Sequence, residues 1–151
     1  MKRKLWFSFL FVILMLFVMR WQGTSLVTAA SPRGIIDLEF ARTPERLRHL
    51  LLFISPSKVQ LNIFLDFIFI IAYTWFLVAA CRYIRSKTSW NKASGAFISL
   101  AITAAMFDVV ENFLLLLIIQ QRFDASLLEV VYYSAAIKFI LVGAVILYLL
   151  F

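Results

Sequence analysis

The stretch GAFISLAITAAMFDVVENFLLLLII, residues 95–119, decides the fold of this chain. Its length and apolar character predict a helix that crosses the roughly 30 Å hydrocarbon core of a membrane. Three polar side chains interrupt it: Asp108, Glu111 and Asn112. Ionisable groups within a span cost about 2.5–3.5 kcal/mol each on insertion scales, so they usually face a bundle interior and mark a site. The stretch therefore predicts a membrane helix that carries a candidate site.

The rest of the chain has the same apolar character. Of its 151 residues, 64% are hydrophobic and 15% are charged, whereas soluble domains have roughly 45–50% and about 25%. Three further apolar segments are long enough to span the membrane. We therefore predict an all-α integral membrane protein, a single transmembrane domain over residues 1–151 that forms a four-helix bundle. The predicted spans cover residues of about 5–21, 59–84, 95–119 and 127–151.

The first span has two interpretations. Its basic start, its apolar core and the small residues around Ala29 resemble a signal peptide, and cleavage would leave three spans. The apolar run is at the long end for a signal peptide, which favours a retained membrane anchor. We therefore expect four spans.

Basic residues beside the span ends predict the orientation. By the positive-inside rule they place both termini, and the link between the second and third spans, in the cytoplasm. We expect the membrane to be the inner membrane of a bacterium. Five basic residues between the first two spans argue for the opposite orientation, but charges in short loops next to spans count most. A net charge of +7 placed in this way gives no reason to expect nucleic acid as a partner. The residues at the span ends are Lys2, Arg3, Lys4, Arg82, Arg85, Lys87 and Lys92.

Residues 22–58 form the one sizeable extramembrane segment and contain all three prolines and the only histidine. Apolar residues alternate with others over residues 36–41, which predicts a short extended stretch with one apolar face. Thr43 and Pro44 then predict the cap and first position of a helix. We expect a short amphipathic helix over residues of about 44–54, lying on the membrane surface or capping the bundle.

Polar side chains repeat at helical spacing in three of the predicted spans. Asp108, Glu111 and Asn112 stand at i, i+3 and i+4 and share one helical face. The second span carries a similar stripe that begins with Asn62, and the fourth span carries Lys138. These stripes would meet at similar depth in the bundle interior. The primary candidates for a ligand-binding or proton-binding site are Asp66, Tyr73, Asp108, Glu111, Asn112 and Lys138.

Glu39 and His49 are secondary candidates in the extramembrane segment. Glu39 lies just above the predicted outer membrane face, from where it could close over the polar stripes. His49 lies on the polar side of the predicted surface helix, a position typical of a solvated histidine.

Three carboxylates in the spans face one ammonium, which leaves two negative charges in excess. Such an excess in an apolar interior requires either protonation of carboxylates or a bound cation. Acids that share a proton suit a relay or acid–base catalysis, and carboxylate and amide oxygens suit a hard divalent ion. A lysine–carboxylate pair can also serve only to fix helix register. The sequence specifies no catalytic residue, metal or cofactor.

Three functional classes remain open. The first is a membrane protein that binds a proton, cation or small ligand, as a small transporter or as a channel subunit that forms a homo-oligomer. The second is a membrane-embedded enzyme that acts on a lipid or isoprenoid, with Asp108 or Glu111 as general acid or base. The third is a structural or regulatory membrane partner without chemistry. The lipid bilayer is a partner in every class.

The chain also resembles a group of small bacterial four-span membrane proteins with a D-x-x-E-N motif in the third span. The resemblance covers residues of about 34–148 and implies a four-helix membrane architecture but no reaction. It further implies that Glu39 belongs with the six primary candidates. The residues that carry it are Gly34-Ile35-Ile36, Glu39-Phe40-Ala41, Thr43-Pro44-Glu45-Arg46, Leu65-Asp66-Phe67, Tyr73, the segment from Asp108 to Asn112, and Lys138-Phe139.

Overall fold

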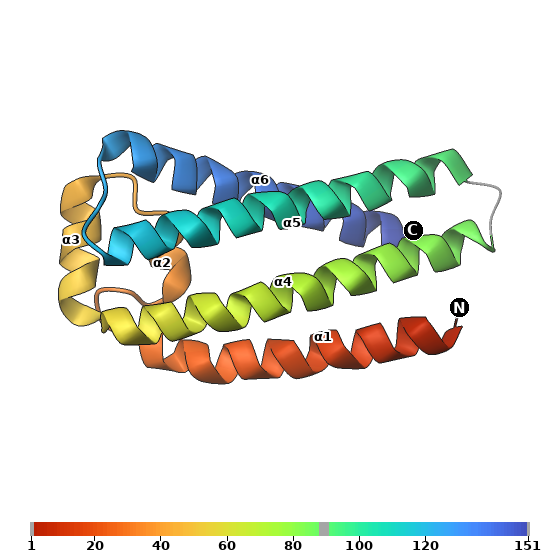
Figure 1. Ribbon diagram of the computed structural model, residues 1–151, viewed down its shortest axis with the longest axis horizontal. Coiled ribbons are helices and arrows are strands. Elements are labelled where there is room, and N and C mark those ends of the chain that lie inside the picture. The colour runs from red at the N-terminus through yellow and green to blue at the C-terminus, as the bar shows by residue number, and fades with distance from the viewer. Residues whose placement is uncertain (1, 88–90, 151) are drawn as a thin grey trace.

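Four long helices make up most of the molecule (Figure 1). The computed structural model describes residues 2–87 and 91–150, and within these ranges the side chains of all residues except 91 and 92. The side chain of Lys92 and the last residue of the predicted fourth span therefore lie outside the described residues. The described part contains no strand, and all four long helices are long and apolar enough to cross a membrane. The prediction of an all-α four-helix bundle is confirmed.

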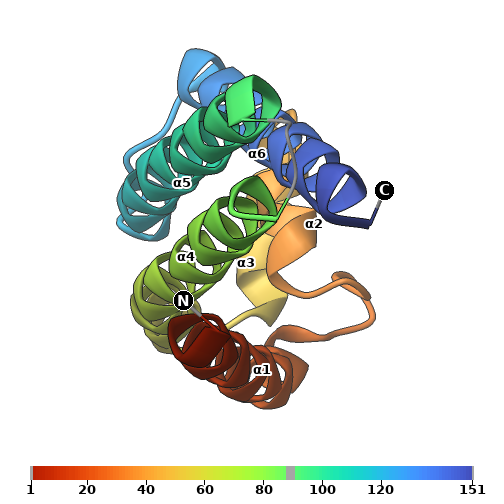
Figure 2. The same cartoon turned by 90° about the vertical axis from the view of Figure 1, so that its right-hand side faces the viewer.

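The long helices pack side by side in chain order and do not form a closed ring. They are α1 (Lys2–Gly23), α4 (Pro56–Arg85), α5 (Asn91–Ile119) and α6 (Ala125–Leu150). Among these helices, α5 packs extensively against both α4 and α6, whereas α1 packs extensively only against α4. Figure 2 shows α4 in the middle, with α1 and α6 at two edges. Helix α1 begins and α6 ends at the same end of the bundle, where α4 ends and α5 begins.

The other end of the bundle is covered by α3 (Pro44–Phe53) (Figure 1). This helix begins as predicted, because the Thr43 hydroxyl accepts a hydrogen bond from the Arg46 N–H at 3.2 Å and a proline occupies the first position. Leu47 and Leu50 are fully buried and pack this helix against the end of the bundle. The last two residues of α3 are apolar and exposed, so its outer side is not uniformly polar.

The segment predicted to be extended is a short helix. Between η1 (Thr24–Leu26) and α3 lies α2 (Ile35–Glu39), so the expectation for residues 36–41 is wrong. An isolated strand would leave its backbone donors and acceptors unpaired, whereas the helical turn pairs the Asp37 N–H with the Gly34 carbonyl at 3.2 Å. Gly34 permits the turn into α2 because its φ of 64° lies in the left-handed region that favours glycine.

Two apolar cores lie along the bundle, with a polar layer between them. The core at the α3 end includes Leu50 and Leu128, and the other core includes Val12 and Leu77. The buried Asp108 lies in the layer between them. Since apolar side chains enclose this layer on both sides, an uncompensated charge within it is unfavourable.

Candidate functional site

Lys138 on α6 is the centre of the polar layer. Its ammonium Nζ donates hydrogen bonds to Asp108 Oδ1 and to Glu111 Oε1, each at 2.9 Å. The other carboxylate oxygen, Glu111 Oε2, is also 2.9 Å from the Lys138 Nζ, but this contact lacks hydrogen-bond geometry. The Glu39 Oε2 atom lies 3.8 Å from Nζ and forms a third ion pair. Lys138 is only 7% exposed and Glu111 is fully buried, so these charges interact out of contact with water.

Helix α4 supplies two further side chains to the same layer. The Tyr73 hydroxyl donates to Asp108 Oδ2 at 2.9 Å. Asn112 Nδ2 donates to Asp66 Oδ2 at 2.6 Å and joins α5 to α4. The structure thus brings all six primary candidates together with Glu39. We call this set the polar cluster: Glu39, Asp66, Tyr73, Asp108, Glu111, Asn112 and Lys138.

Helical spacing and small residues explain why these side chains meet. The i, i+3, i+4 spacing turns the three polar residues of α5 to one face. Ala101 and Ala104 on α5 and Ala135 on α6 are fully buried at the helix contacts. Small residues let helix backbones approach closely, so the Lys138 ammonium can reach the α5 carboxylates.

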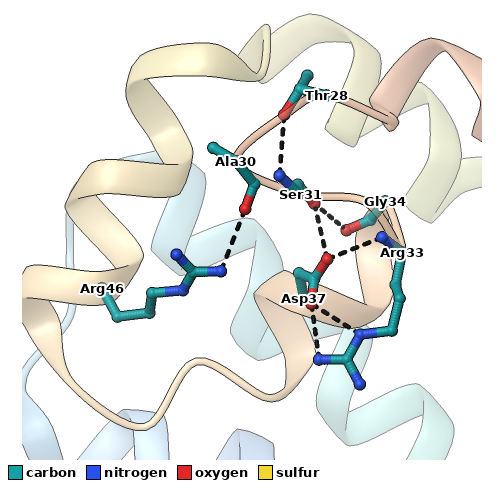
Figure 3. Close-up of polar contacts among 7 residues, drawn as sticks. All are labelled: Thr28, Ala30, Ser31, Arg33, Gly34, Asp37 and Arg46. Carbon is teal, nitrogen blue, oxygen red and sulfur yellow. Dashed lines mark hydrogen bonds and ion pairs between the residues drawn. The ribbon is translucent and has the colours of Figure 1, made fainter.

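Polar contacts hold the loop before α2, the helix that carries Glu39; Figure 3 shows these contacts. Asp37 accepts hydrogen bonds from the backbone N–H of Arg33 at 2.8 Å and from its Nε at 2.9 Å, and Arg33 Nη2 lies 2.7 Å away. The Ser31 hydroxyl donates to the Gly34 carbonyl at 2.7 Å. Arg46 Nη2 on α3 donates to a backbone carbonyl of this loop at 3.1 Å. These contacts fix the loop at both ends, so α2 has a defined place.

The two acids of α2 are in opposite electrostatic situations. Burial acts to raise the pKa of Asp37, but the backbone N–H and guanidinium of Arg33 outweigh it and hold this pKa below its ordinary value. Burial also raises the pKa of Glu39, and there the attraction of Lys138 does not reverse the effect. Asp37 therefore keeps its negative charge to lower pH than an ordinary aspartate, whereas Glu39 keeps its proton to higher pH than an ordinary glutamate.

Aromatic contacts place α2 against the middle of α6. The Phe40 ring packs edge-on against Tyr132, with centroids 5.4 Å apart, and stacks on Phe139 at 6.2 Å. The Arg42 guanidinium also lies over the Tyr132 ring, 4.6 Å from its centroid. Glu39 was expected just above the outer membrane face, from where it could close over the polar stripes, and the structure places it beside Lys138. Figure 2 shows α2 in the space between α1 and α6.

Two residues singled out from the sequence lie outside the polar cluster. His49 is exposed on α3, where its ring lies 5.2 Å from that of Phe53. Asn62, which was expected in the same stripe as the cluster residues of α4, donates to the side chain of Gln22 on α1. Gln22 in turn donates to the Lys58 carbonyl at 2.9 Å. Sequence reasoning missed Gln22, although a glutamine at the end of an apolar run was a signal for such a contact.

The charges of the polar cluster do not balance. Glu39, Asp66, Asp108 and Glu111 are four carboxylates against one ammonium, so the formal excess is three negative charges rather than the two expected from the spans. Within the described part of the chain, Lys138 is the only basic side chain in an ion pair with them. Glu39 Oε2 and Glu111 Oε2 are buried without a hydrogen-bond partner. No group of three or more acidic, histidine or cysteine side chains among the described residues is arranged to hold a metal ion.

A groove between α1 and α6 leads to the polar cluster. A cavity of about 520 Å³ is lined by apolar residues of α1, α4 and α6 and by five members of the cluster. A second cavity of about 550 Å³, nearer the chain termini, shares Phe9, Phe76 and Ile146 with the first. The two cavities therefore adjoin one another. We call them together the groove; its walls are mostly apolar, and the polar cluster lines one end. The cluster residues that line it are Glu39, Asp66, Tyr73, Asp108 and Lys138.

No family model, curated protein or solved structure matches this chain. The resemblance to small bacterial four-span proteins stays a prediction.

Proposed function

We propose that this protein is a small membrane carrier whose polar cluster binds and releases a proton or a cationic ligand. The observation that carries the proposal is the excess of three negative charges in a layer shielded from water. Lys138 can neutralise only one of the four carboxylates. Since unpaired buried charges are strongly unfavourable, protons or a cation must compensate the rest.

Two atoms mark where such compensation would occur. Glu39 Oε2 and Glu111 Oε2 are buried acceptors without a hydrogen-bond partner. A proton on either carboxyl, or a donor group of a ligand, would satisfy them. Glu39 lines the groove, whereas the fully buried Glu111 does not. A ligand in the groove could therefore contact Glu39 but not Glu111, and Glu111 is placed to hold a proton behind Lys138.

A purely structural role accounts less well for this arrangement. One lysine–carboxylate pair would suffice to fix the register of α5 against α6. Each additional buried carboxylate makes the folded protein less stable unless it is neutralised. The polar cluster nevertheless has three more carboxylates, of which only Asp66 is half-buried rather than buried. The groove reaches Glu39, Asp66 and Asp108. This favours a binding site over a fixed helix contact.

A second candidate function is an enzyme that acts on a membrane lipid. The groove favours it, because an apolar substrate could reach Asp108 and the Tyr73 hydroxyl without leaving the bilayer. Carboxylates at the end of such a groove could act as general acid and base. Formation of a new lipid product during incubation of the purified protein with membrane lipids would distinguish an enzyme from a carrier.

The proposal is tested with the double variant Asp108→Asn/Glu111→Gln, which replaces two carboxyl groups by amides of nearly the same shape. Titration from neutral to alkaline pH counts the protons that carboxyl groups still hold at neutral pH, and native mass spectrometry detects a retained cation or amphiphile. We expect the double variant to stay monodisperse and to lose at least one proton per chain or the retained ligand. The control Glu129→Gln removes an exposed charge from α6 and should leave both readouts unchanged. Equal proton counts and equal bound masses in wild type and double variant would overturn the proposal.

We also propose the orientation predicted from the basic residues, with both termini in the cytoplasm. Cys81 is fully buried and is replaced by serine. Single cysteines are then introduced by Ser57→Cys at the α3 end and by Ser86→Cys at the opposite end, both at exposed positions. A membrane-impermeant thiol reagent should label the first variant on intact cells and the second only after permeabilisation. The reverse labelling pattern would invert the orientation.

A further inference from the structure

We propose that the ligand is a membrane-resident amphiphile with one apolar chain and an amine headgroup, which enters sideways between α1 and α6. This inference rests on the proposed function and specifies the class of ligand. It follows from three properties of the groove: its length and apolar walls, the chemistry at its polar end, and the packing of α1 against α4 alone among the long helices.

The groove has the dimensions of a single lipid chain. From Lys138 to the end of α6 there are twelve residues, which correspond to about 18 Å of helix. Half of the hydrocarbon core of a bilayer is about 15 Å. Phe9 and Phe76 line both cavities, so the walls stay apolar over this length. An extended apolar chain can therefore occupy the groove while its headgroup lies at the cluster.

The polar end of the groove selects for positive charge. Three carboxylates line it, and the ammonium of Lys138, the only one among the described lining residues, already pairs with Asp108, Glu111 and Glu39. A phosphate or carboxylate headgroup would therefore add negative charge to an existing excess. An amine would reduce the excess and donate hydrogen bonds to carboxylate oxygens.

Aromatic rings at the same end also favour an ammonium group. The Lys138 Nζ lies 5.0 Å from the centroid of Phe139, so the face of this ring is already within reach of a cation. Phe69 and Tyr73 form an edge-to-face pair 5.4 Å apart in the opposite wall. Rings and carboxylates around one space are the chemistry that binds amines.

Helix α1 is the movable wall of the groove. Among the long helices it packs extensively only against α4. Its polar anchor is at one end, where Gln22 contacts Asn62 and the Lys58 carbonyl. The part of α1 that lines the groove has only apolar contacts, so lipid chains can replace them without loss of hydrogen bonds. Lateral access therefore requires no break in the polar cluster.

The test compares hexadecylamine, hexadecanol and palmitate, which share a chain and differ in headgroup. The protein is held in phosphatidylcholine nanodiscs, and the readouts are the melting temperature and the fluorescence of Trp6, which lines the far end of the groove. The other tryptophans are replaced by phenylalanine for the fluorescence experiment. At hundredfold excess over Kd, hexadecylamine should raise the melting temperature by about 5–10 °C and change the Trp6 emission. Hexadecanol should have a smaller effect and palmitate none.

Two substitutions in α6 test whether hexadecylamine binds in the groove. Val142→Phe narrows the groove and should weaken hexadecylamine binding at least tenfold. The control Val130→Phe makes the same change at an exposed position of α6 outside both cavities and should bind hexadecylamine normally.

Equal stabilisation by all three amphiphiles would contradict the proposed preference for an amine headgroup. Failure of hexadecylamine to bind, with the proton or ligand difference of the double variant intact, would overturn this inference alone. Loss of that difference as well would overturn the proposed function.

Discussion

Replacement of Lys138 by methionine is expected to lower the free energy of unfolding by about 3–5 kcal/mol, the usual effect of breaking a buried ion pair. Methionine keeps much of the apolar stem but removes the ammonium. Asp108 and Glu111 would each lose a hydrogen bond of 2.9 Å and would face each other without a cation. Thermal unfolding of wild type and variant in the same detergent measures the effect.

Two further variants show whether charge is the cause. Lys87→Met makes the same change at an exposed position and should alter stability by no more than about 0.5 kcal/mol. In the triple variant Lys138→Met/Asp108→Asn/Glu111→Gln, uncharged amides replace the two carboxylates opposite Lys138. Most of the stability lost in Lys138→Met should therefore return. If Lys138→Met unfolds at the same temperature as Lys87→Met, Lys138 does not balance the charge of the polar cluster.

The helices and the α5 side of the polar cluster could be predicted from the sequence because they follow from local rules. Span length is set by the thickness of the bilayer. The spacing of Asp108, Glu111 and Asn112 puts them on one face whatever the helix packs against. Lys138 could be predicted as a member of the site because a charge within a span requires a partner.

The sequence suggested that Glu39 lies near the polar stripes, but the helix that carries it could not be predicted, because this helix depends on contacts that are distant in sequence or specific to one turn. Alternation of apolar residues predicted an extended stretch, but a turn at Gly34 and the contacts of Asp37 with Arg33 produce a helix. The stacking of Phe40 then places this helix against the middle of α6. Hydrophobic pattern alone carries no information on such a docking position.

The groove could not be predicted either, because α1 is apolar around its whole circumference. Trp6, Leu10 and Phe17 are exposed, while Val12 and Met15 are buried, and their side chains do not differ in kind. In a soluble helix the apolar face shows which side packs inward. In a membrane helix lipid can replace a neighbour, so the sequence does not show that α1 leaves one side of α4 and α6 open.

Glu39 is expected to keep its proton at pH values at which an ordinary glutamate has lost it. Burial, reinforced by the charge of Asp108 and opposed by Lys138, raises its pKa above the ordinary 4.5. Between that value and the raised pKa, the folded protein binds more protons than the unfolded chain. The free energy of unfolding should therefore fall as pH rises through this window. Thermal unfolding over a pH series measures the slope, which should be smaller in Glu39→Gln.

Infrared difference spectroscopy tests most directly whether the polar cluster holds exchangeable protons. Spectra of the protein in lipid nanodiscs are compared between mildly acidic and alkaline pH for wild type, Glu39→Gln and the control Glu129→Gln. The account predicts a carboxylic acid band at neutral pH that disappears as the pH rises, is weaker in Glu39→Gln and is unchanged in the control. Fully ionised carboxyl groups at neutral pH, with identical spectra for the three proteins and no bound cation, would contradict it.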